Sequence, residues 1–538
     1  MKLCDNSIRN DAAWKEKGFF IPSYDRDKMI AETKANPEWV HFGAGNIFRA
    51  FQANLSQRML EEGFATKGLT VVEGFDYEII EKMYRPHDNL SILVTLKADG
   101  SVDKTVIESI AESCILDSAR EEEFNRLKEI FTADSLKLAT FTITEKGYSL
   151  VNGAGETLPA VAEDYANGPD KPKSYIGKVA ALLYARFQAG EKKIAMVSTD
   201  NCSHNGDKLH AAVSAFAGEW AKNGKAEEGF VAYIEDRTKV SFPWSMIDKI
   251  TPRPDDSVNE ILKKDGVEEL EPGVTSMKTW VAPFVNAEES EYLVIEDQFP
   301  NGRPALEKVG VIFTDRETVD KVERMKVCTC LNPLHTALAV YGCILGFTKI
   351  SDEMKDEQLL KLVKGIGYVE GLPVVTDPGV IDPKEFIDTV VNVRIPNVFM
   401  PDTPQRIACD TSQKLPIRFG ETIKAYAASS QLDVKDLKLI PLVHAGWLRY
   451  LMGVDDQGKA FEPSPDPMLD KAKAYVADVT LGETDESKVK AAVLPLLKDS
   501  AIFGVDLESV GLSDRIVGYF MELIEGEGAV RKTLKKYL

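Results

Sequence analysis

Residues 38–52 read EWVHFGAGNIFRAFQ and decide the fold of the first part of the chain. Trp39–Phe42 has the pattern of a short buried strand, and Gly43 and Gly45 form a G-x-G turn. The helix expected next has four apolar residues on one face: Phe48, Phe51, Leu55 and Met59. Strand, glycine turn and helix begin a dinucleotide-binding unit, in which the backbone approaches a pyrophosphate at the helix N-terminus. The third glycine of the fingerprint is replaced by Phe48, so a tight turn without a ligand is the alternative.

The next expected strand, Leu69–Val72, is followed by Glu73 and Asp76. An acid at the end of the second strand binds a ribose 2′-hydroxyl and repels a 2′-phosphate, which favours NAD over NADP. The alternative is a solvated loop carboxylate. The residues expected to contact the NAD cofactor are Gly43, Gly45, Asn46, Ile47, Phe48, Arg49, Glu73 and Asp76.

The chain then alternates between strands and helices up to a boundary near Asp315. Further strands are expected at Ser91–Leu96, Leu136–Ile143 and Lys193–Ser198, and the clearest helix at Tyr175–Gln188. This alternation predicts an α/β fold with a covered parallel sheet. We expect a Rossmann-type dinucleotide-binding domain over residues 1–315 and a mostly helical catalytic and substrate domain over residues 316–538. The second domain is expected to contain helices at Met354–Lys364, Phe419–Ser430, Pro441–Met452, Asp470–Val479, Ser487–Leu497 and Asp514–Glu525, with loops at 395–418 and 453–467.

A second informative stretch, residues 322–347, reads VERMKVCTCLNPLHTALAVYGCILGF. Asparagine is a good N-cap and proline suits the first helical turn, so Asn332 and Pro333 predict a helix start after a break near Leu331. Lys326 lies just before the break and His335 just after it. The alternative is a packed core helix with a satisfied histidine.

Composition narrows the class of protein. The 538 residues are 44% hydrophobic and 28% charged, as in soluble globular proteins, and the net charge is −20. This charge argues against nucleic-acid and anionic-membrane partners, and it requires a local basic cluster for any anionic substrate. No apolar run approaches 18 residues and the N-terminus lacks a signal-peptide core. The seven scattered cysteines form no metal site, so we expect reduced thiols, no metal and a cytoplasmic location.

Several motifs occur in an order that resembles the polyol-specific long-chain dehydrogenase/reductase family, the mannitol dehydrogenases and hexuronate reductases. They are HFGAGNIFRAFQ (41–52), TITEKGY (142–148), STDNCSHNG (198–206), SMIDKITP (245–252), ERMKVCTCLNPLHTALA (323–339), RIACDTSQKLP (406–416) and GWLRYLMG (446–453). The resemblance covers about Val40 to Pro467.

The resemblance implies roles for particular residues. The family's base is a lysine in a K-x4-N-x2-H pattern, which Lys326, Asn332 and His335 match except that five residues separate the lysine from the asparagine. Glu323 preserves the family's E-x-x-K spacing, so Lys326 stays the expected base and Glu323 its proton route to solvent. The loop asparagine corresponds to Asn201 or, as the alternative, Asn205. The family's signature aspartate falls on Asp248, and its arginine and lysine fall on Arg406 and Lys414.

These residue types suit the reduction of a ketone. Amide groups of Asn201 and Asn332 can donate to the developing alkoxide, and Lys326 can supply the proton. Arg406 and Lys414 can bind hydroxyls or a carboxylate. Arg418 is a further carboxylate candidate, and its alternative is a solvated surface arginine.

We therefore expect an NAD-dependent oxidoreductase with its active site between the two domains. The first expected reaction is the reduction of a keto-hexuronate, fructuronate to D-mannonate. The alternatives are interconversion of mannitol and fructose by a mannitol 2-dehydrogenase, and reduction of tagaturonate. A catalytically silent dinucleotide-binding sensor is the rival from another class. The expected partner is a small sugar acid or polyol, and the expected assembly a monomer or weak homo-oligomer.

Overall fold

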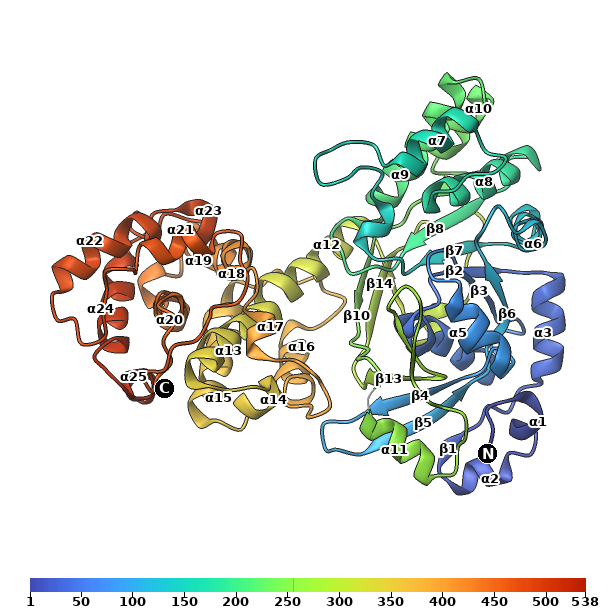
Figure 1. Ribbon diagram of the computed structural model, residues 1–538. Helices are drawn as coiled ribbons and strands as arrows, with labels where there is room; N and C mark the ends of the chain where they lie inside the picture. The colour runs from blue at the N-terminus through green and yellow to red at the C-terminus, as the bar shows by residue number, and fades with distance from the viewer. Residues whose placement is uncertain (255) are drawn as a thin grey trace. The chain divides into compact units, whose positions relative to one another are not determined.

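The computed structural model describes residues 1–254 and 256–538 and divides into two compact units (Figure 1). Unit 1 comprises Met1–Lys97 and Ser101–Asp320, and unit 2 comprises Ala98–Gly100 and Lys321–Leu538. The division falls within helix α12 (Arg316–Met325), just after the boundary expected near Asp315.

Unit 1 is built around a six-stranded sheet in which every pair of neighbours is parallel. Its spatial order is β6 (Ile110–Ile115), β3 (Leu69–Glu73), β2 (Trp39–Phe42), β7 (Leu138–Phe141), β8 (Ile194–Ser198) and β9 (Val240–Ser241). Numbered along the chain, this is the order 3-2-1-4-5-6 of doubly wound dinucleotide-binding folds. The expected α/β fold with a Rossmann-type N-terminal domain is therefore confirmed.

The two faces of this sheet are buried in separate apolar clusters. Val40 and Phe42 of β2 point into one cluster, together with α6 (Glu121–Thr132), α8 (Tyr175–Gln188), α9 (Asn205–Lys222) and α10 (Glu228–Glu235). Trp39 points into the other, with α5 (Gln52–Glu61). Because successive side chains alternate across a strand, one four-residue strand contributes to both layers. Figure 1 shows the helices on either side of the sheet.

The strand expected at Ser91–Leu96 forms with those bounds as β4, but it does not join the parallel sheet. It pairs antiparallel with β5 (Val102–Ile107), in a separate sheet ordered β1 (Phe19–Phe20), β5, β4 and β13 (Phe284–Glu288). Parallel neighbours need a crossover of a dozen residues or more, and the short segment between β4 and β5 permits only a hairpin. The place in the parallel sheet belongs to β6, which was not among the expected strands.

Smaller elements complete unit 1. A three-stranded sheet consists of β10 (Ser245–Asp248), β14 (Tyr292–Glu296) and β15 (Ile312–Thr314), and a hairpin of β11 (Gly273–Val274) and β12 (Trp280–Val281). The remaining helices are α1 (Asp5–Ile8), α2 (Ala12–Glu16), α3 (Arg26–Ala35), α4 (Asn46–Ala50), α7 (Pro159–Asn167) and α11 (Asp256–Lys264), with short turns η1 (Ile80–Tyr84), η2 (Arg85–His87), η3 (Glu145–Tyr148) and η4 (Leu306–Val309).

Unit 2 is helical and surrounds α13 (Asn332–Leu345). This helix is almost fully buried and packs against α20 (Leu439–Leu451), α15 (Glu357–Lys364) and α17 (Pro404–Ile407). The other helices are α14 (Ile350–Glu353), α16 (Pro383–Thr389), α18 (Thr411–Leu415), α19 (Glu421–Ala428), α21 (Leu469–Ala474), α22 (Glu486–Leu497), α23 (Ser500–Phe503), α24 (Ser513–Leu523) and α25 (Ala529–Tyr537), with short turns η7 (Leu372–Val374) and η10 (Val434–Asp436). The loop expected at 395–418 was wrong in part, because it contains α17 and α18.

Four π-helical turns interrupt the helices of unit 2. They are η5 (Lys326–Cys330), η6 (Gly365–Gly371), η8 (Val390–Arg394) and η9 (Pro416–Gly420). Three of them, η5, η6 and η9, pack against α13. By length and composition Arg316–Leu345 is apolar enough to cross a membrane, but 78% of its most apolar window is buried in the structure, as in a core helix.

Candidate functional site

The glycine turn after β2 combines close backbone packing at Gly43 with open space at Gly45. Gly43 has φ +106°, its N–H donates to the Val72 carbonyl at 2.8 Å, and a Cβ there would lie 2.2 Å from the Thr142 carbonyl oxygen. Only glycine fits this position. A Cβ at Gly45 would meet no atom within 4 Å, so the backbone before α4 borders open space. The turn therefore leaves room for a ligand at the helix start.

Phe48 stands where the fingerprint has its third glycine, and its side chain packs against the sheet. Its buried ring stacks on His41 of β2, with ring centroids 4.4 Å apart. The single helix expected after the turn is divided, because Phe51 leaves helical geometry (φ −120°, ψ −72°) between α4 and α5. All four apolar residues of the expected face are nevertheless buried.

Glu73 and Asp76 lie at the end of β3, as the sequence predicts, but both are buried. The Glu73 carboxylate accepts hydrogen bonds from the N–H groups of Ala44, Phe75 and Asp76 at 2.8–3.2 Å. Burial raises the pKa of Glu73 although these N–H groups favour its charged form. Asp76 accepts from the Thr275 hydroxyl at 2.6 Å, and its Oδ1 has no hydrogen-bond partner among the described residues. Glu73 thus ties the glycine turn to β3.

Arg49 is also turned inward. Its buried guanidinium donates to the Ala282 carbonyl at 2.7 Å and to Asn46 Oδ1 at 3.0 Å. Burial lowers its pKa. Arg49 therefore orients Asn46 at the first turn of α4, while Ile47 between them is half-buried.

The loop after β8 separates the two candidate asparagines. Asn205 is fully buried, and its amide makes five hydrogen bonds, with Asp200, Gly206 and Ser245. Its Nδ2 already donates to three acceptors, so Asn205 holds the loop against β10. Asn201 is exposed. Of the two amides, only that of Asn201 is presented at the surface of unit 1.

Sequence reasoning missed Asp200, which organises the same end of the sheet. Its carboxylate accepts from the Tyr148 hydroxyl at 2.5 Å and from the N–H groups of Ile143 and Thr144 at 3.0 and 2.8 Å. Burial raises its pKa. Asp200 therefore joins the TITEKGY and STDNCSHNG segments. Its position next to Asn201 in the sequence is the feature from which its role could have been predicted. Asp248 lies at the end of β10, opposite Tyr292 of β14, and is 8% exposed.

In unit 2, the stretch from Lys326 to Asn332 contains the extra residue relative to the family's spacing. Lys326 begins the π turn η5, and the Leu331 N–H donates to the Lys326 carbonyl at 3.1 Å, five residues back. A π turn accommodates one more residue than an α-helical turn, and such turns are frequent at functional sites. The expected break at Leu331 is present (φ −129°), although Asn332 is the first residue of α13 rather than its cap.

The catalytic candidates of unit 2 differ in burial. Lys326 is only 4% exposed, whereas Asn332 and His335 are half-buried at the start of α13. Glu323 lies one helical turn before Lys326 on α12 and is half-exposed. Of these four polar side chains, Lys326 is therefore the most buried.

The basic residues of the SQKLP region are not equivalent. Arg418 of η9 donates to the Thr336 hydroxyl at 2.6 Å and to the Asn332 carbonyl at 3.5 Å, and burial lowers its pKa to about 10. Lys414 donates to the Ile407 carbonyl at 2.9 Å, and burial and the nearby Arg418 lower its pKa. The Arg406 side chain is 67% exposed and pairs with Asp402. Arg418 thus lies beside Asn332 and is not a solvated surface arginine.

Comparison with known proteins covers both parts of the chain. Residues 37–308 match the mannitol dehydrogenase Rossmann domain, and residues 318–521 match the mannitol dehydrogenase C-terminal domain. The chain belongs to the mannitol dehydrogenase family. As a member, it is an oxidoreductase acting on CH–OH groups.

The similar proteins of this family include both sugar-acid and polyol enzymes. The D-mannonate oxidoreductase of Thermotoga maritima is 52% identical over 538 residues, covering 100% of this chain and 99% of that one. Among solved structures, the mannitol 2-dehydrogenase of Pseudomonas fluorescens in complex with NAD and D-mannitol is 26% identical with a TM-score of 0.67, covering 100% and 99% of the two chains. A D-sorbitol dehydrogenase is 25% identical with a TM-score of 0.79, covering 99% and 100%.

Proposed function

We propose that this protein reduces a keto-hexuronate, fructuronate, to D-mannonate with NADH, in the cytoplasm and as a monomer or weak homo-oligomer. The observation that carries the choice of a sugar acid is Arg418, a guanidinium held beside Asn332 by hydrogen bonds to α13. A guanidinium group can bind a carboxylate through two hydrogen bonds, and a neutral polyol has no carboxylate to bind. The high identity to a D-mannonate oxidoreductase supports the same choice.

NADH would bind at the glycine turn and supply the hydride. Gly43 and Gly45 leave the backbone accessible to its pyrophosphate, and Arg49 orients Asn46 there. The buried acids Glu73 and Asp76 at the end of β3 disfavour a 2′-phosphate by like-charge repulsion. These features support NAD over NADP.

The proton that completes the reduction comes from Lys326 in this proposal. Desolvation lowers the pKa of a lysine, and a base with a pKa near neutrality works in both directions of the reaction. The amides of Asn201 and Asn332 donate to the oxygen as it becomes an alkoxide, and each such donor contributes about 3 kcal/mol. Asn201 is preferred over Asn205 because the Asn205 amide is occupied by structural hydrogen bonds.

The other candidates bind the substrate or move protons. His335 lies near Asn332 on α13 and belongs to the catalytic set with Lys326 and Asn332, and Glu323 passes the Lys326 proton to solvent. Arg418 binds the substrate carboxylate. Lys414 and Arg406, on the neighbouring segment, bind the substrate as well, and Asp248 accepts a hydrogen bond from a substrate hydroxyl. No group of three or more histidine, cysteine, aspartate and glutamate side chains among the described residues could hold a metal.

A substrate panel tests this proposal. Fructuronate, tagaturonate and fructose are compared by kcat/KM with NADH and with NADPH. We expect fructuronate with NADH to be the best combination. Preference for fructose would instead assign a mannitol 2-dehydrogenase, preference for tagaturonate would assign the third candidate, and a higher kcat/KM with NADPH would overturn the cofactor assignment. Binding of NADH without turnover of any of the three substrates would favour the alternative of a catalytically silent dinucleotide-binding sensor.

A further inference from the structure

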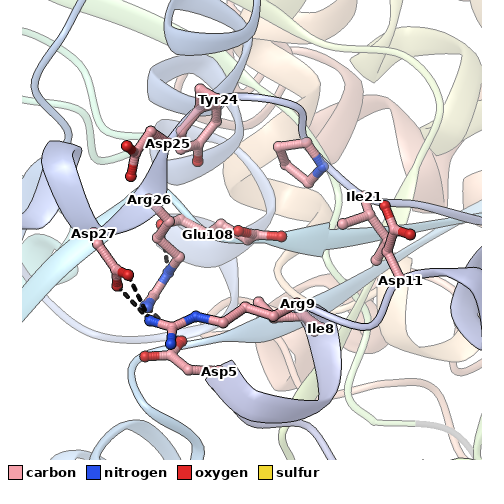
Figure 2. A pocket seen from close by; sticks show the side chains of 11 residues that line it. Asp5, Ile8, Arg9, Asp11, Ile21, Tyr24, Asp25, Arg26, Asp27 and Glu108 are labelled. Atoms are coloured by element: carbon pink, nitrogen blue, oxygen red, sulfur yellow. Dashed lines mark hydrogen bonds and ion pairs between the residues drawn. The ribbon is translucent and has the colours of Figure 1, made fainter.

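We propose that unit 1 carries a second ligand site, specific for a linear aliphatic diamine, in a cavity near the N-terminus. The cavity has a volume of about 270 Å³ and lies among α1, α2, the start of α3 and the segment that joins β5 to β6 (Figure 2). It contains none of the residues assigned to the reductase, so the proposal does not depend on that function.

The cavity is lined by five carboxylates and two guanidinium groups, and both guanidinium groups are already paired. Arg9 donates to both Asp27 oxygens at 2.6 Å. Arg26, 8% exposed, donates to Asp5, to the Asp88 carbonyl at 2.6 Å and to the backbone carbonyl of Glu108 at 3.3 Å. Neither cation bonds to the Glu108 carboxyl group. The lining therefore keeps an excess of negative charge.

Glu108 is the residue that points to a ligand. It is 5% exposed, and its Oε1 is buried without a hydrogen-bond partner among the described residues. The Tyr24 hydroxyl is buried and equally without a partner, and Figure 2 shows it directed toward the Glu108 side chain. An unpaired buried carboxylate costs several kcal/mol, and a bound ammonium group would remove this cost by neutralising the charge and donating hydrogen bonds.

The distribution of the carboxylates selects a diamine. Glu108 is buried, whereas Asp25 is exposed, and the Asp25 carboxylate accepts a hydrogen bond from the Lys28 N–H. Ile8, Ile21 and Pro22 add apolar wall to the same cavity. Two ammonium groups joined by methylenes match one buried and one exposed acid in a cavity that also has apolar wall. A metal ion would lack its ligands, since the carboxylates of the cavity are not arranged so that three or more of the described side chains could hold one.

The site should respond to pH in a defined direction. Burial raises the pKa of Glu108 to about 7. The positive charge of Arg26 on α3 lowers this pKa, whereas the negative charges of Asp5 on α1 and Glu61 on α5 raise it further. Tyr24 faces the same carboxyl, and burial and Glu108 keep its pKa well above its usual value, so it stays a neutral donor. Because the ammonium needs the charged carboxylate, binding should be about tenfold weaker at pH 6 than at pH 8.

Isothermal titration of the full-length protein with 1,4-diaminobutane tests the proposal, with 1,4-butanediol as the neutral isostere. We expect saturable binding of one diamine at pH 8, no binding of the diol, and at least tenfold weaker diamine binding by Glu108→Gln. The matched control, Glu122→Gln, removes an exposed acid of α6 outside the cavity and should bind like the wild type.

A second variant guards against misfolding of the first. Tyr24→Phe removes only the unpartnered hydroxyl and should weaken diamine binding severalfold while its Tm stays at the wild-type value. The absence of saturable binding by the wild type, equal binding by Glu108→Gln with a wild-type Tm, or equal binding of the diol would each overturn the proposal.

Discussion

At the scale of single residues, the assignment of Lys326 as the acid/base makes the sharpest prediction. Lys326→Ala should lower kcat by a factor of about 10²–10⁴, the usual contribution of a positioned acid/base, because no other amine replaces it at the start of η5. NADH binding, measured by fluorescence titration, should stay within a few-fold of wild type. Lys361→Ala, on an exposed face of α15, is the control. Turnover within threefold of wild type in Lys326→Ala would remove this role from Lys326.

The two loop asparagines should fail in different ways. Asn205→Ala loses five buried hydrogen bonds and should lower the Tm by several degrees, because each bond contributes about 1 kcal/mol. Asn201→Ala, at an exposed position, should keep the Tm and lower kcat about 10²–10³-fold through loss of an alkoxide donor. Thermal unfolding and steady-state kinetics of both variants separate the roles. The reverse pattern would make Asn205 the catalytic amide.

At the scale of elements, the π turn η5 offers a local way to accommodate the extra residue that the proposed assignment of Lys326 and Asn332 requires. If the turn absorbs the extra residue locally, deleting Val327 should close a regular α-helical turn without rotating Lys326 relative to α13. We expect kcat/KM within about tenfold of wild type and little change in Tm. A loss as deep as that of Lys326→Ala would mean that the extra residue sets the position of the lysine.

Helix α20 buries a histidine at a cost that depends on pH. Both ring nitrogens of His444 lack a hydrogen-bond partner among the described residues, and burial lowers its pKa to about 3. The unfolded chain takes up this proton below about pH 6.5, so stability is full above that pH and falls as pH decreases, by on the order of 2 kcal/mol at pH 5.

His444→Leu should remove this penalty. We expect the free energy of unfolding to increase by about 1–3 kcal/mol at pH 7, because two unpaired polar atoms leave the core. We also expect a smaller drop in Tm between pH 7 and pH 5. Calorimetry at the two pH values measures both effects, and His41 of unit 1 stays in both proteins, so the comparison isolates His444. An unchanged drop in Tm would show that His444 is solvated or protonated in the folded protein.

Several elements could be predicted from local sequence, whereas their partners could not. The strand, glycine turn and helix at 38–52 and the helix at Tyr175–Gln188 follow from periodicity and turn chemistry. Ser91–Leu96 forms the expected strand in another sheet, because periodicity does not specify the neighbouring strand. The inward turn of Arg49 and the three N–H contacts of Glu73 depend on tertiary packing, and no residue type in η5 signals a π turn.

At the scale of the whole molecule, the net charge of −20 opposes the approach of an anionic sugar acid. The proposed specificity for a uronate therefore has to rest on short-range contacts, and the candidate for these is Arg418, which is held beside Asn332. A charge-assisted hydrogen bond contributes about 1.5–3 kcal/mol, equivalent to roughly 10- to 100-fold in KM. Neutral fructose, which has no carboxylate, should lose less when Arg418 is removed.

One measurement tests most directly the claim that the protein reduces a sugar acid whose carboxylate Arg418 binds. It is the ratio of kcat/KM for fructuronate to kcat/KM for fructose, with NADH, in the wild type and in Arg418→Ala. We predict a wild-type ratio well above one that falls about 10- to 100-fold in Arg418→Ala. A ratio that Arg418→Ala leaves unchanged would keep the reaction and remove Arg418 from the carboxylate site. A wild-type ratio below one would contradict the account and make the protein a mannitol 2-dehydrogenase.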